Sequence, residues 1–364
     1  MFYFTMAPSL KQKPIKELAV GDEIIAFFIL RKKELRVKKA DGEPYLNLEL
    51  GDASGRIFAT LWEQIAELDE VLQTGDIVKV KGTVIEYKNR LLLNIEKIRK
   101  ATAEDNVRPE QFLPKSSKSV EEMLAELREL ISNINNPYCQ QVLQLIFSEN
   151  GLTSVSKTSK FAVSPAGKLW HHNRIGGLLE HTLAVAHICN QVAQHYAQSE
   201  EKPLIDRDLL ITAALLHDIG KIESYRTEKG FIELTDEGRL LGHIPIGYQI
   251  VETAIEQIPD FPQELRKQLL HLILSHHGEL EQGAPVVPMT LEAIILYYVD
   301  ELDSKVDAFR RIIKGDIIAQ RNSEPNSTSP GNQEGAWSRY VKLLDRFIYF
   351  SHLSNHTESE EDSL

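Results

Sequence analysis

The chain has 364 residues, a formal net charge of −12 and 42% hydrophobic residues. Because this length exceeds one ordinary compact domain, we expect at least two. The only two cysteines, Cys139 and Cys189, exclude a disulfide framework and a thiolate zinc site. No segment approaches the roughly 18 apolar residues of a membrane span, and the N-terminus lacks the pattern of a signal peptide. We therefore expect a cytoplasmic protein without membrane contact.

The acidity is unevenly distributed along the chain. The first 100 residues carry 17 Lys+Arg and 15 Asp+Glu, so the excess of acidic side chains lies in the remainder. An acidic chain that binds a polyanion must confine the contact to local basic patches or to metal ions. Residues 353–364 end in an acidic run, which predicts a disordered acidic tail.

Strand patterns dominate the N-terminal part. Residues 45–50 alternate strictly between apolar and polar side chains, which is typical of a half-buried strand. Further strands are predicted at 22–30, 56–62, 77–87 and 91–98, with a short helix at 63–72. Five strands with a helix between the third and the fourth is the order of an OB barrel. We therefore predict an OB-fold nucleic-acid-binding domain at residues 15–101.

The rest of the chain has helical periodicity. Residues 102–117 are polar, contain Pro109 and Pro114, and are predicted to be a linker. Ser119 suits the N-cap of a first helix, and helical patterns then dominate to His352. The predicted fold is multidomain, with an all-β OB barrel followed by an all-α helical bundle at residues 118–352.

Metal-ligand residue types are concentrated in the helical part. Residues 215–221 read Leu-Leu-His-Asp-Ile-Gly-Lys, and a partly buried His–Asp pair is costly unless a cation pairs with it. Imidazole and carboxylate ligands without a cysteine cluster suit Mn, Fe, Co, Ni or Zn. The candidate ligands are His181, His217, Asp218, His243, His276, His277 and Asp300. Seven ligands in one helical domain are enough for two ions that share Asp218.

Structural roles are the alternatives for these residues. The His217-Asp218 pair could be an ion pair at a helix end, and His276 with His277 could cap a helix C-terminus. His243 stands in Gly-His-Ile-Pro, which is equally typical of a loop. Lys221 could pair with a neighbouring carboxylate. The ordered set of seven favours the metal interpretation.

The set resembles the HD-domain metal-dependent phosphohydrolases, and the added histidines make it similar to their dinuclear branch. The order of OB barrel and HD domain further resembles the YhaM-type 3′–5′ exoribonucleases. So do the phrases Gly-Gly-Leu-Leu-Glu-His-Thr and Leu-Ser-His-His-Gly-Glu-Leu-Glu. The resemblance covers roughly residues 15–350. It implies two divalent ions per chain, with Mn²⁺ as the first expectation and Co, Fe, Ni, Zn or Mg as alternatives.

The resemblance also implies a reaction. Metal-activated water would hydrolyse single-stranded RNA from its 3′ end and release 5′-mononucleotides, with single-stranded DNA as a further substrate. Asp218, as the shared ligand, and Lys221, one helical turn after His217, are the expected catalytic residues. Two other functions stay open, a hydrolase of nucleotides or cyclic dinucleotides and a nucleic-acid-binding protein with an idle HD domain. Homo-oligomers are left open as well.

Further candidates concern nucleic-acid binding. They are Arg31, Lys33, Arg36, Lys38, Tyr45, Trp62 and His172. The four basic residues are expected on a solvated loop that meets phosphates. The aromatic side chains either stack on bases or fill the barrel core, because alternation alone does not tell which face points inward.

Overall fold

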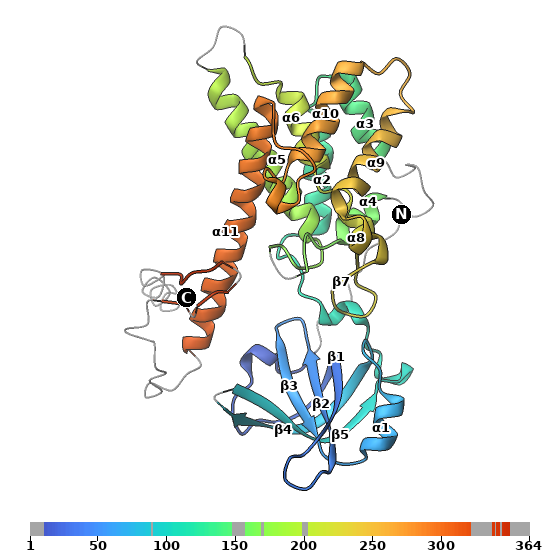
Figure 1. Cartoon of the computed structure of the whole chain (residues 1–364), viewed down its shortest axis with the longest axis vertical. Coiled ribbons are helices and arrows are strands. Elements are labelled where there is room, and N and C mark those ends of the chain that lie inside the picture. The colour runs from blue at the N-terminus through green and yellow to red at the C-terminus, as the bar shows by residue number, and fades with distance from the viewer. Residues whose placement is uncertain are drawn as a thin grey trace, which may run out of the picture. The chain divides into compact units, whose positions relative to one another are not determined.

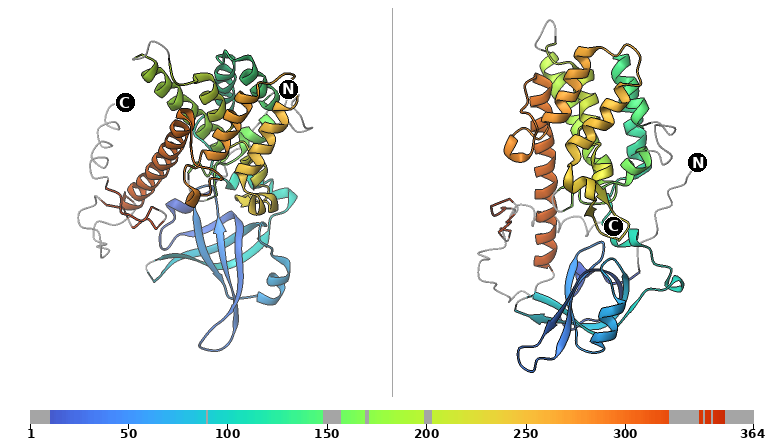
Figure 2. Two further views of the ribbon diagram at one scale, coloured as in Figure 1. Left: turned by 45° about the horizontal axis from the view of Figure 1, so that its top comes forward. Right: turned by 45° about the vertical axis from the view of Figure 1, so that its right-hand side comes forward.

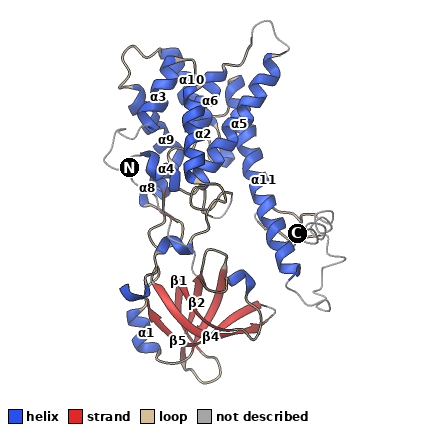
Figure 3. Ribbon diagram, turned by 180° about the vertical axis from the view of Figure 1, so that it is seen from behind, coloured by secondary structure: helices blue, strands red, loops and turns tan. Residues whose placement is uncertain are grey.

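A computed structural model describes residues 11–88, 90–147, 157–168, 171–198, 203–321, 337–338, 340–342 and 344–349. It divides into a barrel unit, residues 1–117 and 225–235, and a helical unit, residues 118–224 and 236–364. Figure 3 shows the large sheet in one unit and the helical bundle in the other. The predicted fold class is confirmed. The predicted acidic tail at 353–364 lies outside the described residues.

The barrel has the predicted OB topology. Its elements are β1 (Glu23–Val37), β2 (Pro44–Gly51), β3 (Arg56–Leu61), α1 (Ile65–Val71), β4 (Ile77–Tyr87) and β5 (Arg90–Lys100). The strands close in the order β1-β2-β3-β5-β4, and the barrel can be followed in Figure 2. The β3–β5 pair is parallel and the other pairs are antiparallel. Strand β4 begins just after a turn at Thr74 and Gly75.

Strand β1 is longer than predicted. It was expected to end near Leu30, but it continues to Val37 because its second half pairs with β2. The register shifts between Leu30 and Lys32, so the strand has a bulge at Arg31. Three of the basic residues that were expected on a loop, Arg31, Lys33 and Arg36, therefore lie on a paired strand.

The outer face of the barrel carries aromatic side chains. Leu46, Leu48 and Leu50 are fully buried on the inner face of β2, so their alternating neighbours point outward. Phe58 is 45% exposed and Trp62 is 43% exposed. The core alternative for these aromatic residues is therefore wrong.

The barrel unit includes a hairpin from the region predicted to be helical. β6 (Tyr225–Arg226) pairs with β7 (Glu233–Leu234), and Phe231 in their connection packs against Ile29 and Phe112. Phe112 ends a 3₁₀ helix in the segment 102–117. The segment predicted to be a linker thus contributes an apolar contact to the barrel unit, because burial of Phe112 and Phe231 outweighs its polar composition.

The helical unit surrounds one apolar core. Its helices are α2 (Val120–Ser132), α3 (Pro137–Phe147), α4 (Lys157–Val163), α5 (Gly177–Ala197), α6 (Arg207–Leu216), α7 (Lys221–Ser224), α8 (Asp236–Leu240), α9 (His243–Ile255), α10 (Gln263–Ser275) and α11 (Leu291–Arg321). Helix α5 packs against both α6 and α11 (Figure 1). Among the described residues, no helix has the length and apolar character needed to cross a membrane.

Candidate metal centre

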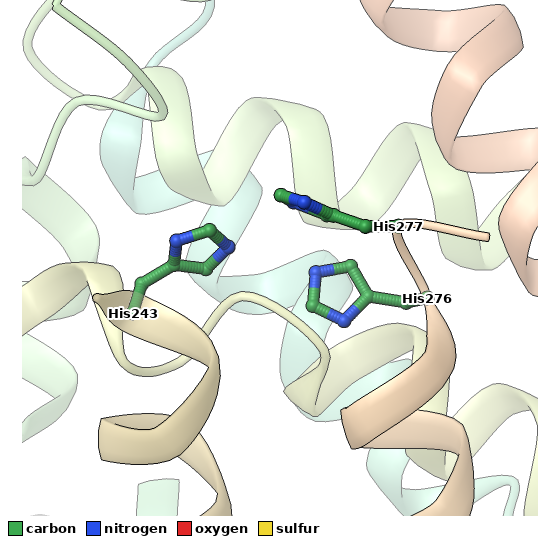
Figure 4. A group of neighbouring side chains, drawn as sticks. All are labelled: His243, His276 and His277. Carbon is green, nitrogen blue, oxygen red and sulfur yellow. The ribbon is translucent and has the colours of Figure 1, made fainter. Parts of the chain in front are cut away.

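The seven predicted ligands converge in the helical unit from five helices. Helix α5 carries His181, α6 is followed by His217 and Asp218, α9 begins at His243, α10 is followed by His276 and His277, and α11 carries Asp300. One atom each of His181, His217 and Asp300 lies within 4.8 Å of the others. The same holds for His243, His276 and His277, whose rings point toward one another in Figure 4. We call these the first and the second ligand group.

Asp218 lies between the two groups. Its Oδ2 is 3.4 Å from His217 Nε2 and 3.5 Å from His181 Nε2. Its Oδ1 is 3.3 Å from His243 Nε2 and 3.7 Å from His276 Nε2. Each oxygen of this carboxylate therefore faces one group, which is the arrangement of a bridging ligand.

Backbone carbonyls fix the imidazole tautomers. The Nδ1 atom lies 2.9 Å from a carbonyl oxygen for His217, 2.7 Å for His276 and 3.0 Å for His277. A carbonyl only accepts hydrogen bonds, so Nδ1 carries the proton and Nε2 keeps its lone pair. His276 thus caps the end of α10, as the structural alternative expected, and still directs Nε2 toward Asp218.

A hydrogen-bonded chain fixes His181 in the same way. Arg174 Nη2 donates to His172 Nδ1 over 2.9 Å, so the proton of His172 is on Nε2, which donates to Asp303 Oδ2 over 2.9 Å. His181 Nδ1 is 2.7 Å from the same Asp303 oxygen. His181 therefore donates through Nδ1 and turns Nε2 toward Asp300, which is 3.1 Å away.

This chain also corrects the predicted role of His172. The residue is 4% exposed, and both of its ring nitrogens have partners within the protein. Its backbone N–H donates to Asp307 over 2.7 Å. Because the ring has no free donor or acceptor to offer, we withdraw the nucleic-acid role and assign His172 to the support of His181.

The protonation states suit cation binding. Burial alone would raise the pKa of Asp218, but the Lys221 ammonium and the facing His217 imidazole outweigh it and hold the pKa well below its usual value. The Lys221 ammonium is 2.5 Å from Asp218 Oδ2, so the carboxylate pairing that was the structural alternative is present. Burial lowers the pKa of His243 well below its usual value. The site therefore offers an anionic carboxylate and a neutral imidazole, the states in which these groups bind metals.

His181 differs because it lies among carboxylates. Burial would lower its pKa, but the hydrogen bonds that its ring donates to Asp300 and Asp303 raise the pKa to about 9. A cation bound at Nε2 would take the place of that proton.

Unpaired buried atoms show that the residues fit divalent ions. Asp218 Oδ1, His243 Nε2 and His276 Nε2 are buried and have no hydrogen-bond partner among the described residues. Leaving such groups unsatisfied is costly, and one cation between them would satisfy all three. Imidazole with carboxylate is also the donor set that borderline divalent metals prefer.

Gly220 determines how His243 reaches the site. A Cβ on Gly220 would lie 2.0 Å from the carbonyl oxygen of His243 and 2.6 Å from Gly247 N. Only glycine lets the backbone after Asp218 lie against the start of α9. His243, which the sequence left open as a loop residue, is thereby held as the first residue of that helix.

The outer face of the barrel brings three of the predicted nucleic-acid residues together. The ring centroids of Tyr45 and Trp62 are 4.9 Å apart, and Lys38 Nζ lies 5.0 Å from the Trp62 ring. Trp62 Nε1 donates to Asn94 Oδ1 over 3.0 Å. Asn94 was not among the predicted residues, and it is recognised only through the parallel pairing of β3 with β5.

Two other predicted residues, Arg31 and Lys33, contact side chains of the barrel unit itself. The Arg31 guanidinium lies 4.9 Å above the Phe231 ring, and Lys33 Nζ is 2.8 Å from Asp69. These contacts engage both side chains, and the phosphate contacts expected for Arg31 and Lys33 stay predictions. Arg36 is about half exposed and pairs with Glu34, so its phosphate contact stays a prediction.

The supporting residues Asp303, Asp307 and Arg174 were missed by sequence reasoning. Arg174 contacts Asp307 at 3.1 Å and Glu180 at 2.9 Å. A signal existed for the two carboxylates, since Asp303 follows Asp300 by three residues and Asp307 follows Asp303 by four, which places all three on one side of α11. Arg174 offered no such signal.

Comparisons with known proteins agree with this arrangement. An HD domain matches residues 178–305, and an OB-fold nucleic acid binding domain matches residues 29–101. A solved OB-fold domain of replication protein A from Methanococcus maripaludis is 26% identical, with a TM-score of 0.20, and covers 24% of this chain and 92% of that one. A 3′-5′ exoribonuclease YhaM from Shouchella clausii is 32% identical over 83% of this chain and 90% of its own. The YhaM protein of Geobacillus sp. is 32% identical over 83% and 88%. The chain therefore belongs to the YhaM family of 3′–5′ exoribonucleases.

Proposed function

We propose that this protein is a divalent-metal-dependent 3′–5′ exoribonuclease that hydrolyses single-stranded RNA to 5′-mononucleotides. The observation that carries the proposal is the place of Asp218, with one carboxylate oxygen toward each ligand group. A ligand shared in this way is typical of two-metal phosphodiester hydrolysis. The names of the relatives support the 3′–5′ polarity and the RNA substrate.

The two ions would be held by different residues. His181, His217 and Asp300 would hold the first, His243, His276 and His277 the second, and Asp218 both. When bound, such cations supply Lewis-acid activation of water and neutralise charge on the phosphate. Mn²⁺ is our first expectation, because imidazole with carboxylate suits borderline divalent metals.

The chain's own groups keep the site ready for that chemistry. Carbonyl and carboxylate partners of Nδ1 hold the imidazole Nε2 atoms in the site before any substrate binds. Lys221 keeps Asp218 anionic, and its ammonium is the nearest described cation to the shared carboxylate. Groups fixed in advance in this way need no reorganisation during the reaction.

The barrel would bind the single-stranded RNA. Trp62 with Tyr45 offers an exposed aromatic surface for a base, and Lys38 places a positive charge beside it. Base–aromatic stacking contributes about 1–3 kcal/mol per base and tolerates any sequence. An acidic protein can bind RNA if the contact is confined to such a patch.

The test uses a 5′-labelled oligoribonucleotide with Mn²⁺. A ladder that shortens from the 3′ end is expected, and EDTA should stop it. Trp62→Ala should weaken binding of a long strand about tenfold or more, whereas Tyr196→Ala, an exposed aromatic residue on α5, should not. Intact RNA together with turnover of a cyclic dinucleotide, or binding without turnover in any metal, would refute the proposal.

A further inference from the structure

His171 is a buried polar residue that the metal centre does not use. Its ring centroid lies 4.9 Å from that of the ligand His181. Both ring nitrogens are buried, and neither has a hydrogen-bond partner within the described part of the chain. Leaving a buried donor or acceptor unpaired costs about 1–3 kcal/mol. A native site that keeps two such atoms needs a partner for them.

A metal ion is not that partner. The described groups whose atoms lie close enough to share an ion contain His181, His217 and Asp300, or His243, His276 and His277, or His172, His181 and Asp303. His171 belongs to none of them. The proposed second cation would satisfy the unpaired atoms of Asp218, His243 and His276, but it would leave the ring of His171 without a partner.

The surroundings of the ring indicate an anion close to the cations. His171 lies within electrostatic range of Lys221, Asp218 and Asp300, the groups at the centre of the site. A histidine ring carries at least one N–H donor in either protonation state. An N–H donor beside bound cations suits a phosphoryl oxygen, which accepts the hydrogen bond while it faces the metal ions.

The loop that carries His171 is firmly held. Its neighbour His172 is fixed by Asp303 and Arg174 through the ring and by Asp307 through the backbone. The backbone of the residue after His171 is thus held in place before substrate arrives, and a donor to a reacting group requires such a fixed support.

We propose that His171 is a substrate contact, and that its ring N–H donates to a non-bridging oxygen of the phosphate held at the first ligand group. This proposal rests on the proposed function for the identity of the substrate. It makes His171 a catalytic residue that is not a metal ligand.

The experiment compares His171→Leu, which removes the donor, with His171→Asn and His171→Gln, which place an amide N–H near ring Nδ1 or Nε2. His195→Leu, an exposed histidine on α5, is the matched control. For each Mn²⁺-loaded protein we would measure bound metal, kcat/KM on a short oligoribonucleotide, and Kd for adenosine 5′-monophosphate and for adenosine. The ratio of the two Kd values reports the phosphate contact alone.

Loss of a hydrogen bond to a charged group corresponds to a decrease of about tenfold to hundredfold in a rate or binding constant. We expect His171→Leu to lose that factor in kcat/KM and to lose preference for the monophosphate, with bound metal unchanged. One amide variant should recover most of the loss. An unchanged Kd ratio in His171→Leu, or equal behaviour of the two amide variants, overturns the proposal. If the wild type leaves RNA intact but shows the His171-dependent preference, the proposed function fails while this contact stands.

Discussion

Asp303 provides the most direct test of how the metal centre is held. Its Oδ2 accepts from His181 Nδ1 over 2.7 Å and lies 2.9 Å from His172 Nε2, while the carboxylate makes no contact with the second ligand group in the described residues. Asp303→Asn keeps the size of the side chain and removes the charge that fixes the tautomer of His181. We therefore expect an effect on one of the two ion positions only.

The size of the effect follows from the geometry. Losing a carboxylate behind a metal-binding histidine typically weakens metal binding about 10–100-fold, or about 1.4–2.7 kcal/mol. The Asp303 side chain is 13% exposed, so water can relieve part of the loss, and the lower half of that range is expected. Titration of the metal-free protein with Mn²⁺ by calorimetry should show one weakened and one unchanged class of site.

Asp307→Asn is the matched control. Asp307 contacts Arg174 and the His172 backbone, one step further from His181, so its loss should change metal affinity less than about threefold. If Asp303→Asn leaves both classes unchanged, or weakens both equally, the inferred support of His181 is wrong.

Three further predictions follow from burial and close contacts. Asp218→Ala should lose both ions and all hydrolysis, and retained turnover would contradict the bridging role. It should also lower the free energy of unfolding by up to about 3–5 kcal/mol, because the buried Lys221 ammonium loses its contact with that carboxylate. Gly230→Ala should destabilise the barrel unit by about 1–3 kcal/mol in chemical denaturation, since φ is +71° and a Cβ would lie 2.6 Å from an Ile29 methyl. Gly42→Ala, at φ +76° with nothing within 4 Å, separates the backbone cost from the clash. Burial raises the pKa of Cys139 to about 12, so this thiol stays protonated at pH 8 and should react with Ellman's reagent only after unfolding; rapid reaction of the native protein would show that it is accessible.

The sequence alone determined the order of elements and indicated the candidate metal ligands. Period-two alternation at 45–50 and the spacing of turns were sufficient for five strands and a helix, because both signals are local. The ligands were recognisable because imidazole and carboxylate are costly to bury without a cation, and they stood in apolar helical surroundings. The resemblance to the family rested on the same residues.

Only the tertiary structure decided which side chains from distant parts of the sequence contact one another. Alternation could not tell that Trp62 points outward, and no local pattern could join Phe231 to Ile29 across some 200 positions or Asp303 to His172 across 131. Such contacts depend on how distant segments pack, and a single sequence carries no periodic signal for them. The tautomer of His181, the contact of Arg31 with Phe231 and the unpaired ring of His171 were therefore decided by the packing of the folded chain.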